Sequence, residues 1–181
     1  PGKTIACLDG GTDAWIAAGQ DTADGEERML TTGTVGFRER DPHWSPDGRR
    51  VAFVTDRTGY DNVGVTDIES GETTLLTETR YDHANPTWSP DGTMLAFLWD
   101  AAGKQDLFVV RSGQEPVALT DFPVDPDLLV SDIGSVAWVS PTEILFSKNG
   151  QLWTVSPSSP KPMRYPELSD AGNFTLSPDR T

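Results

Sequence analysis

The sequence predicts an all-β protein, a β-propeller built of four-stranded antiparallel blades, and three observations lead to that prediction. First, the motif Trp-Ser-Pro-Asp-Gly at residues 44–48 returns at residues 88–92. Second, short runs rich in β-branched and aromatic side chains alternate with Gly-containing turns. Third, no stretch shows the sustained hydrophobic period of a helix. Four-stranded repeats of about 40–45 residues with Trp and Gly signatures are typical of propeller blades.

Each repeat is predicted to contain four strands in the same order. A short strand approaches the Ser-Pro-Asp-Gly turn, where Pro presets φ, Asp bonds nearby backbone and Gly adopts a positive φ. The second strand follows at residues 51–54, and a Gly-bearing hairpin at 57–60 leads to an alternating third strand. A turn at 70–72 leads to the fourth strand, and a Leu-Thr pair closes the repeat at 76–77.

Further matches between the copies set the repeat boundaries. Residues 50–53 align with 94–97, and residues 61–65 align with 106–110. The predicted repeats cover approximately residues 1–40, 41–84, 85–133 and 134–172, and the start of a further repeat covers 173–181. One blade cannot bury both of its sheet faces, so neighbouring blades must stack. We therefore expect residues 1–181 to form a single propeller domain or a fragment of a larger propeller with six to eight blades.

Composition excludes several classes of function. The chain of 181 residues carries 28 acidic and 14 basic side chains, for a formal net charge of −14. This charge argues against nucleic-acid partners and favours cationic ones. The longest apolar run, residues 94–99, is far shorter than the roughly 20 residues of a membrane helix, so we expect no membrane insertion. A single Cys excludes an intrachain disulfide framework.

The motif set resembles the TolB-type propeller repeat, which also occurs in the N-terminal propellers of prolyl-oligopeptidase-like serine peptidases. The resemblance covers residues 41–122 closely, 1–34 moderately and 134–168 loosely, where Val139 replaces the Trp. It implies a propeller of bacterial type that serves as a protein- or peptide-binding or scaffold module. The alternative it implies is the substrate-gating propeller of a serine peptidase whose catalytic domain is absent from this chain. Localisation stays open: periplasmic for a TolB-like protein, cytoplasmic for a peptidase propeller.

No catalytic residue is predicted. The strained Gly-Xaa-Ser-Xaa-Gly turn that an α/β-hydrolase needs does not occur. The Ser of each Ser-Pro-Asp-Gly motif is interpreted as a turn residue whose hydroxyl caps local backbone. Peptidases of the dipeptidyl-peptidase type clamp a substrate amine with paired Glu residues. The pair Glu26-Glu27 lies in a polar turn and is interpreted as solvated charge.

Metal sites receive only weak support, and no cofactor is expected. The two histidines, His43 and His83, do not occupy equivalent repeat positions, because His43 aligns with Thr87 and His83 with Glu39. A metal-dependent propeller lyase or glycan enzyme, which would use several channel histidines, is a further alternative. A Ca²⁺ site in the acidic loops is a further alternative, although these loops lack EF-hand spacing. Asp residues that bracket the second hairpin, such as Asp56 and Asp61, are predicted to have a turn role.

Propeller geometry places the candidate binding residues on the face with the channel mouth, where blade-to-blade connections and second-to-third-strand hairpins open. Long loops on a rigid scaffold tend to carry function, and the connector 121–132 is the longest. Its apolar members, among them Phe122, need cover from a neighbouring blade or a partner. The predicted ligand- or partner-binding residues are Arg40, Asp41, Arg57, Tyr60, Asp82, His83, Asn85, Asp125, Asp127 and Asp132.

Overall fold

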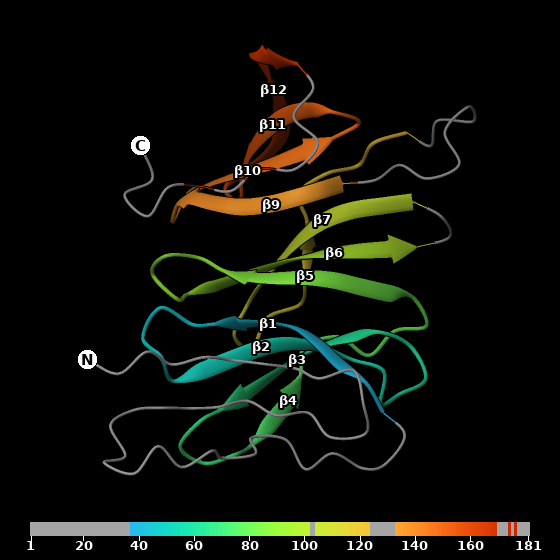
Figure 1. Ribbon diagram of the computed structural model, residues 1–181, viewed down its shortest axis with the longest axis vertical. Helices are drawn as coiled ribbons and strands as arrows, with labels where there is room; N and C mark the ends of the chain where they lie inside the picture. The colour runs from blue at the N-terminus through green and yellow to red at the C-terminus, as the bar shows by residue number, and fades with distance from the viewer. Residues whose placement is uncertain (1–36, 102–103, 124–132, 170–173, 175, 177–181) are drawn as a thin grey trace. The chain divides into compact units, whose positions relative to one another are not determined.

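The computed structural model describes residues 37–101, 104–123, 133–169, 174 and 176, and all regular elements among them are strands (Figure 1). The strands form three four-stranded sheets. The first sheet contains β1 Glu39–Trp44, β2 Arg50–Thr55, β3 Asn62–Asp67 and β4 Thr73–Leu75. The second contains β5 Asp82–Trp88, β6 Met94–Ala101, β7 Lys104–Arg111 and β8 Val117–Ala118. The third contains β9 Ile133–Ser140, β10 Glu143–Lys148, β11 Gln151–Ser156 and β12 Ser159–Ser169.

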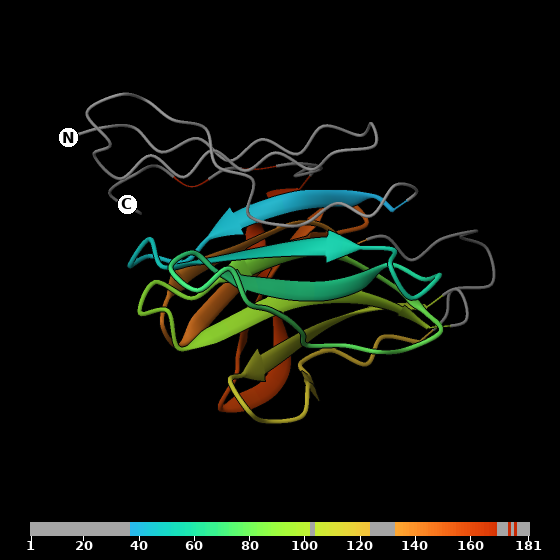
Figure 2. The same cartoon turned by 90° about the horizontal axis from the view of Figure 1, so that it is seen from below.

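Each sheet is a meander in which the strands lie in chain order. Within the sheets β2 and β3 pair antiparallel, as do β6 with β7 and β10 with β11. The view in Figure 2 shows the twist of the strands that an antiparallel sheet is expected to have. The chain divides into two compact units, residues 1–86 and 87–181, and the division falls within β5. The described part of the chain holds no helix with the length and apolar character that a bilayer crossing requires.

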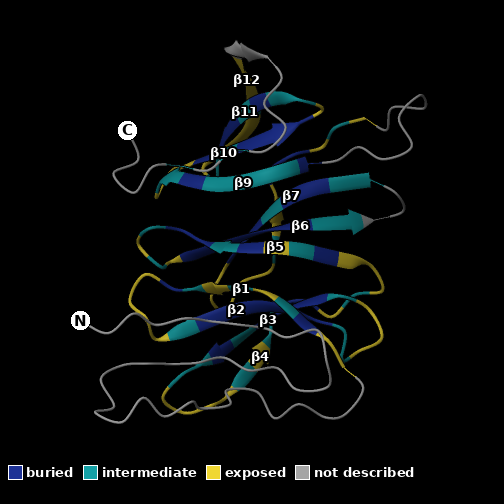
Figure 3. Ribbon diagram, in the orientation of Figure 1, coloured by how far each residue is buried: buried dark blue, intermediate teal, exposed yellow. Residues whose placement is uncertain are grey.

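The second strand of each sheet forms the core. Phe53, Phe97 and Phe146 on these strands are all 0% exposed, and their neighbours along each strand are mostly buried as well (Figure 3). A strand that is covered on both faces has a continuous apolar sequence. This explains why apolar and polar residues do not alternate at residues 51–54. Phe53 differs from the other two because it lies opposite Gly64, where a Cβ would sit 3.0 Å from the ring carbon Cζ.

The Ser-Pro-Asp-Gly turns have the predicted structural role. Ser45 Oγ donates a 2.6 Å hydrogen bond to Asp47 and accepts one of 2.9 Å from the backbone N–H of Arg50. Ser89 makes the same two bonds at the same lengths within its own turn. Both hydroxyls are buried, and both turn glycines have φ of 68°. The serine hydroxyls are therefore occupied by the turns they stabilise.

A second repeated hydrogen-bond network joins the start of the third strand to the Thr that follows the fourth strand in each of the first two sheets. This network shows which residues of the two third strands are equivalent. Thr77 Oγ1 donates to Asn62 at 3.0 Å and accepts from the backbone N–H of Val63. Thr120 Oγ1 donates to Asp106 at 2.8 Å and accepts from the N–H of the residue after Asp106. Asn62 is thus the structural equivalent of Asp106, and the sequence alignment of Asp61 with Asp106 was wrong by one residue. We call each Asn/Asp–Thr pair the Asx–Thr brace.

The first strands of two sheets share a third repeated feature. Asp41 on β1 and Asn85 on β5 both adopt left-handed backbone angles, with φ of 55° and 52°. Asx residues tolerate this conformation better than other side chains do. A proline follows each of them, and on β1 the pairing register with β2 shifts between Arg40 and His43. The Asx-Pro step therefore interrupts the regular ladder of β1 at this point.

Candidate functional site

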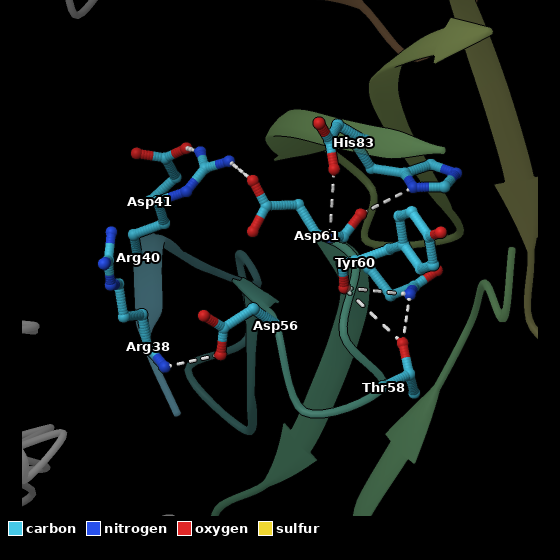
Figure 4. Close-up of polar contacts among 10 residues, drawn as sticks. Arg38, Arg40, Asp41, Asp56, Thr58, Tyr60, Asp61 and His83 are labelled. Atoms are coloured by element: carbon cyan, nitrogen blue, oxygen red, sulfur yellow. Dashed lines mark hydrogen bonds and ion pairs between the residues drawn. The ribbon is translucent and has the colours of Figure 1, made fainter. Parts of the chain in front are cut away.

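The described candidates come from three segments of one compact unit: the start of β1, the β2–β3 hairpin and the start of β5 (Figure 4). Arg40 pairs with Asp41 and with Asp61, which lies at the end of the hairpin. The backbone N–H of Asp61 in turn donates to Asp82. Asn85 lies farther along β5 and is exposed. Three candidates, Asp125, Asp127 and Asp132, lie outside the described residues, as does Glu26-Glu27.

Arg40 is held between two carboxylates. Its Nη1 donates to Asp41 at 2.7 Å, and its Nη2 forms an ion pair with Asp61. Burial alone would lower the pKa of the Arg40 guanidinium, but the hydrogen bonds and charges of Asp61 and Asp41 outweigh burial and raise it. The Arg40 side chain is still 42% exposed. The site therefore carries a fixed positive charge that is already balanced by its own carboxylates.

Arg57 turns toward the protein instead of toward solvent. Its Nη2 pairs with the carboxylate of Glu39 on β1, whose side chain is almost completely buried. A buried carboxylate needs such a partner, because an unpaired charge in the interior is costly. Arg57 thus has a structural role that the sequence did not reveal. Glu39 aligns with His83, and both positions are buried.

His83 anchors the start of β5 to the hairpin. Its side chain is 1% exposed, and its Nδ1 lies 2.7 Å from the backbone carbonyl oxygen of Asp61. The backbone N–H of His83 donates to the same oxygen at 2.9 Å. Since a carbonyl only accepts, Nδ1 carries the proton. Burial lowers the pKa of His83, and hydrogen bonds to Asp61 and Tyr81 only partly oppose that effect.

This environment predicts a pH dependence of stability. Because the pKa of His83 is lower in the folded state, the unfolded state binds more protons once the pH falls below about 6.5. The free energy of unfolding should therefore fall between about pH 7.5 and 5.5, down toward the folded pKa. His83→Asn keeps a donor for the Asp61 carbonyl, and chemical denaturation should show a shallower decrease for this variant. Equal slopes of the free energy of unfolding against pH for the two proteins over this range would contradict the prediction. Between about pH 7.5 and 9 we expect the two slopes to be the same.

The described residues do not assemble a metal centre. They contain no group of three or more His, Cys, Asp and Glu side chains that could hold a metal ion. His83 is buried against a backbone carbonyl, while His43 on β1 is exposed.

The carboxylates of Asp56 and Asp61, predicted to have a turn role, reach other segments instead: Asp56 accepts a 2.6 Å bond from the backbone N–H of Arg38, and Asp61 pairs with Arg40. The turn itself is closed by the main-chain carbonyl of Asp56, which accepts from the Gly59 N–H at 2.8 Å.

The ring of Phe122, in the long connector, is covered by other side chains. Phe122 packs edge-on against Phe146 and Trp153, with ring centroids 6.2 and 5.2 Å away. The ammonium of Lys148 lies 4.8 Å from the Phe122 ring centroid. The cover that the sequence analysis required for Phe122 thus comes from the third sheet.

The family described as "TolB beta propeller domain" matches residues 20–122. The chain belongs to the TolB β-propeller family. This confirms the resemblance and the propeller fold, and the match includes both copies of the Trp-Ser-Pro-Asp-Gly motif. A comparison with curated proteins gave no match.

Solved structures with the TolB-type fold include proteins of several kinds. TolB from Acinetobacter baumannii superposes with a TM-score of 0.60 at 19% identity, over 83% of this chain and 36% of that one. A puromycin-hydrolysing peptidase of Mycobacterium tuberculosis gives 0.63 at 18% identity, over 81% and 25%. Oligogalacturonate lyase from Vibrio parahaemolyticus gives 0.62 at 11% identity, over 84% and 47%. At these identities the likeness shows the fold alone, and the chain spans half or less of each protein.

Sequence reasoning missed two residues of this TolB-type blade. Asp61 holds Arg40 with its carboxylate and His83 with its carbonyl. Tyr81 precedes the β5 anchor and is 44% exposed. A signal existed in the sequence, because the dipeptide Tyr-Asp occurs at 60–61 and again at 81–82.

Proposed function

We propose that this TolB-like propeller is a non-catalytic module that binds a protein or peptide at one end of its first described blade. We call this surface the hairpin face, formed by residues 37–41, 56–61 and 78–83. The observation that carries the proposal is the exposure of Phe37, Tyr60 and Tyr81, at 39%, 43% and 44%, around an ordered set of charges. Aromatic side chains beside polar groups are the typical anchors of protein interfaces.

The rigidity of the hairpin face supports a binding role. The β2–β3 hairpin is fixed at both ends, since Asp56 bonds the backbone of Arg38 and Asp61 bonds β5. Inside it, Asn62 Nδ2 donates to Thr58 Oγ1 at 2.7 Å and to the carbonyl of Tyr60 at 3.1 Å. A preorganised loop loses little conformational entropy when a partner binds. The backbone that carries Tyr60 is therefore held in place by hydrogen bonds on both sides.

The alternative is the substrate-gating propeller of a prolyl-oligopeptidase-like serine peptidase. The fold likeness to the puromycin-hydrolysing peptidase favours it, as this chain covers 25% of that protein. The two roles differ in what else the full-length protein contains. A Gly-Xaa-Ser-Xaa-Gly hydrolase domain encoded in the same reading frame would support the gating role. A metal-dependent lyase is a weaker alternative, and a metal analysis of the purified protein would test it.

The binding role can be tested by selecting peptides from a random dodecapeptide library on the immobilised chain. Selected peptides should bind Tyr60→Ala at least tenfold more weakly, because an exposed anchor is removed without disturbing the core. Glu69→Ala, an exposed change in the β3–β4 turn at the opposite end of the same sheet, should leave binding unchanged. Failure to enrich any peptide, or equal loss in both variants, would contradict the assignment of the hairpin face.

A further inference from the structure

Two Tyr-Asp dipeptides that lie 21 residues apart meet on the hairpin face. The backbone N–H of Asp61 donates to Asp82 Oδ1 at 3.3 Å. The buried His83 bonds the carbonyl of Asp61 through both its ring and its backbone N–H. Tyr60 and Tyr81 directly precede these bonded residues, so the two phenol side chains are carried on one hydrogen-bonded junction. We call Tyr60, Asp61, Tyr81 and Asp82 the twin Tyr-Asp surface.

The two tyrosines are exposed although their neighbours are firmly held. A single exposed aromatic residue needs no explanation, but two that are carried on one hydrogen-bonded junction offer apolar area to a partner. The six exposed large hydrophobic residues of the described chain are Phe37, Tyr60, Tyr81, Val117, Met163 and Tyr165. The hairpin face therefore holds three of these six, and the twin Tyr-Asp surface two.

The two carboxylates of the junction differ in whether a basic side chain pairs with them. Asp61 is neutralised by Arg40, as described above. Asp82 is exposed and forms no salt bridge within the described residues, where its Oδ1 accepts the long hydrogen bond from the Asp61 N–H. A carboxylate with open acceptor positions thus lies on the same hydrogen-bonded junction that carries two exposed tyrosines. This combination suits a cation, which a tyrosine face attracts and a carboxylate pairs with.

We propose that the twin Tyr-Asp surface binds an arginine side chain of the partner peptide. This inference rests on the proposed binding function and names the chemistry of its ligand. A guanidinium can stack on a tyrosine ring while its planar N–H groups reach a carboxylate, which an ammonium does less well. The net charge of −14 attracts a basic segment over longer distances. Asp82 supplies the specific charge contact, and Tyr60 and Tyr81 supply the stacking surface.

The test is a titration of the chain with acetyl-Gly-Arg-Gly-Arg-Gly-amide, followed by NMR chemical shifts, beside peptides with Lys or Glu in place of Arg. The Arg peptide should bind best and the Glu peptide not at all. Asp82→Asn keeps the Oδ1 acceptor for the Asp61 N–H but removes the charge, and should weaken binding about tenfold. Glu69→Gln removes one charge at the other end of the sheet and should change affinity less than about twofold.

The outcomes separate this inference from the proposed function. Equal binding of the Arg peptide to wild type and Asp82→Asn, or equal affinity for the Glu peptide, would overturn the arginine site. If library peptides then still depend on Tyr60, the binding function stands with a different ligand chemistry. If neither probe binds the hairpin face, both proposals fail. Matching thermal unfolding midpoints for all variants establish that a loss of binding does not reflect a loss of fold.

Discussion

Replacing Phe53 with alanine should lower the free energy of unfolding by about 3–5 kcal/mol, the range typical of a buried core phenylalanine. The ring is 0% exposed and lies on the central strand of its sheet. Its opposite residue, Gly64, has no side chain that could move into the vacated space. The cavity should therefore persist. Guanidinium denaturation followed by circular dichroism measures the change.

The same substitution at an exposed phenylalanine provides the control. Phe37→Ala removes a ring that is 39% exposed and should cost less than about 1 kcal/mol. The companion change Gly64→Ala places a Cβ 3.0 Å from Phe53 Cζ and should destabilise the wild type by about 1–3 kcal/mol. In a Phe53→Leu background this cost should shrink, because the ring atom it meets is gone. Comparable losses for Phe53→Ala and Phe37→Ala would show that Phe53 is not a core residue.

Replacing Asp106 with leucine should destabilise the second sheet by about 3 kcal/mol or more. Its Oδ1 accepts from Thr120 Oγ1 at 2.8 Å and from the Phe122 N–H at 3.3 Å. Its other oxygen pairs with Lys104 at 3.0 Å. Leucine fills a similar volume but leaves these donors without their acceptor in a mostly buried place. Thermal and guanidinium unfolding both report the loss.

The first sheet supplies the matched variant for this experiment. Asn62 makes the same Asx–Thr brace with Thr77 and the Thr79 N–H as an amide. Asp106→Asn should therefore retain the brace and cost only about 1 kcal/mol, chiefly the ion pair with Lys104. An Asp106→Asn variant as unstable as Asp106→Leu would mean that the negative charge matters and the hydrogen-bond geometry does not.

The fold could be predicted from the sequence because the strongest signals for the fold are local. A Ser-Pro-Asp-Gly turn is specified by the conformations of its own residues, and Ser45 and Ser89 bond only within a few positions. The apolar runs around Phe53 and Phe97 indicate buried central strands in the same way. The repeat distance between the two motifs then sets the blade length. Residues 1–36 of the first repeat and the stretch 124–132 lie outside the described residues, so their assignments stay predictions.

The site was harder to predict because its contacts are long-range or involve backbone atoms. The pairing of Arg57 with Glu39 depends on a register that charge counting does not provide. The bond from His83 to the carbonyl of Asp61 has no sequence signature, since every residue has a carbonyl. The alignment error at Asp61 does not come from a difference in hairpin length, because Thr55 pairs with Asn62 in one sheet and its equivalent Trp99 pairs with Asp106 in the next. The first sheet has Asn62 where the second has Asp106, and the nearest aspartate is one residue earlier. Alignment by residue type therefore matched the wrong aspartate.

The Asx-Pro steps on β1 and β5 affect how the protein behaves at high concentration. Each of these strands ends the order of its sheet, and a straight terminal strand can recruit a strand from another molecule. The left-handed Asp41 bends the first of them, and Pro42 offers no N–H at the next position. Asn85 and Pro86 repeat the arrangement on β5. We therefore expect the residues that interrupt these strands to disfavour edge-to-edge pairing between molecules.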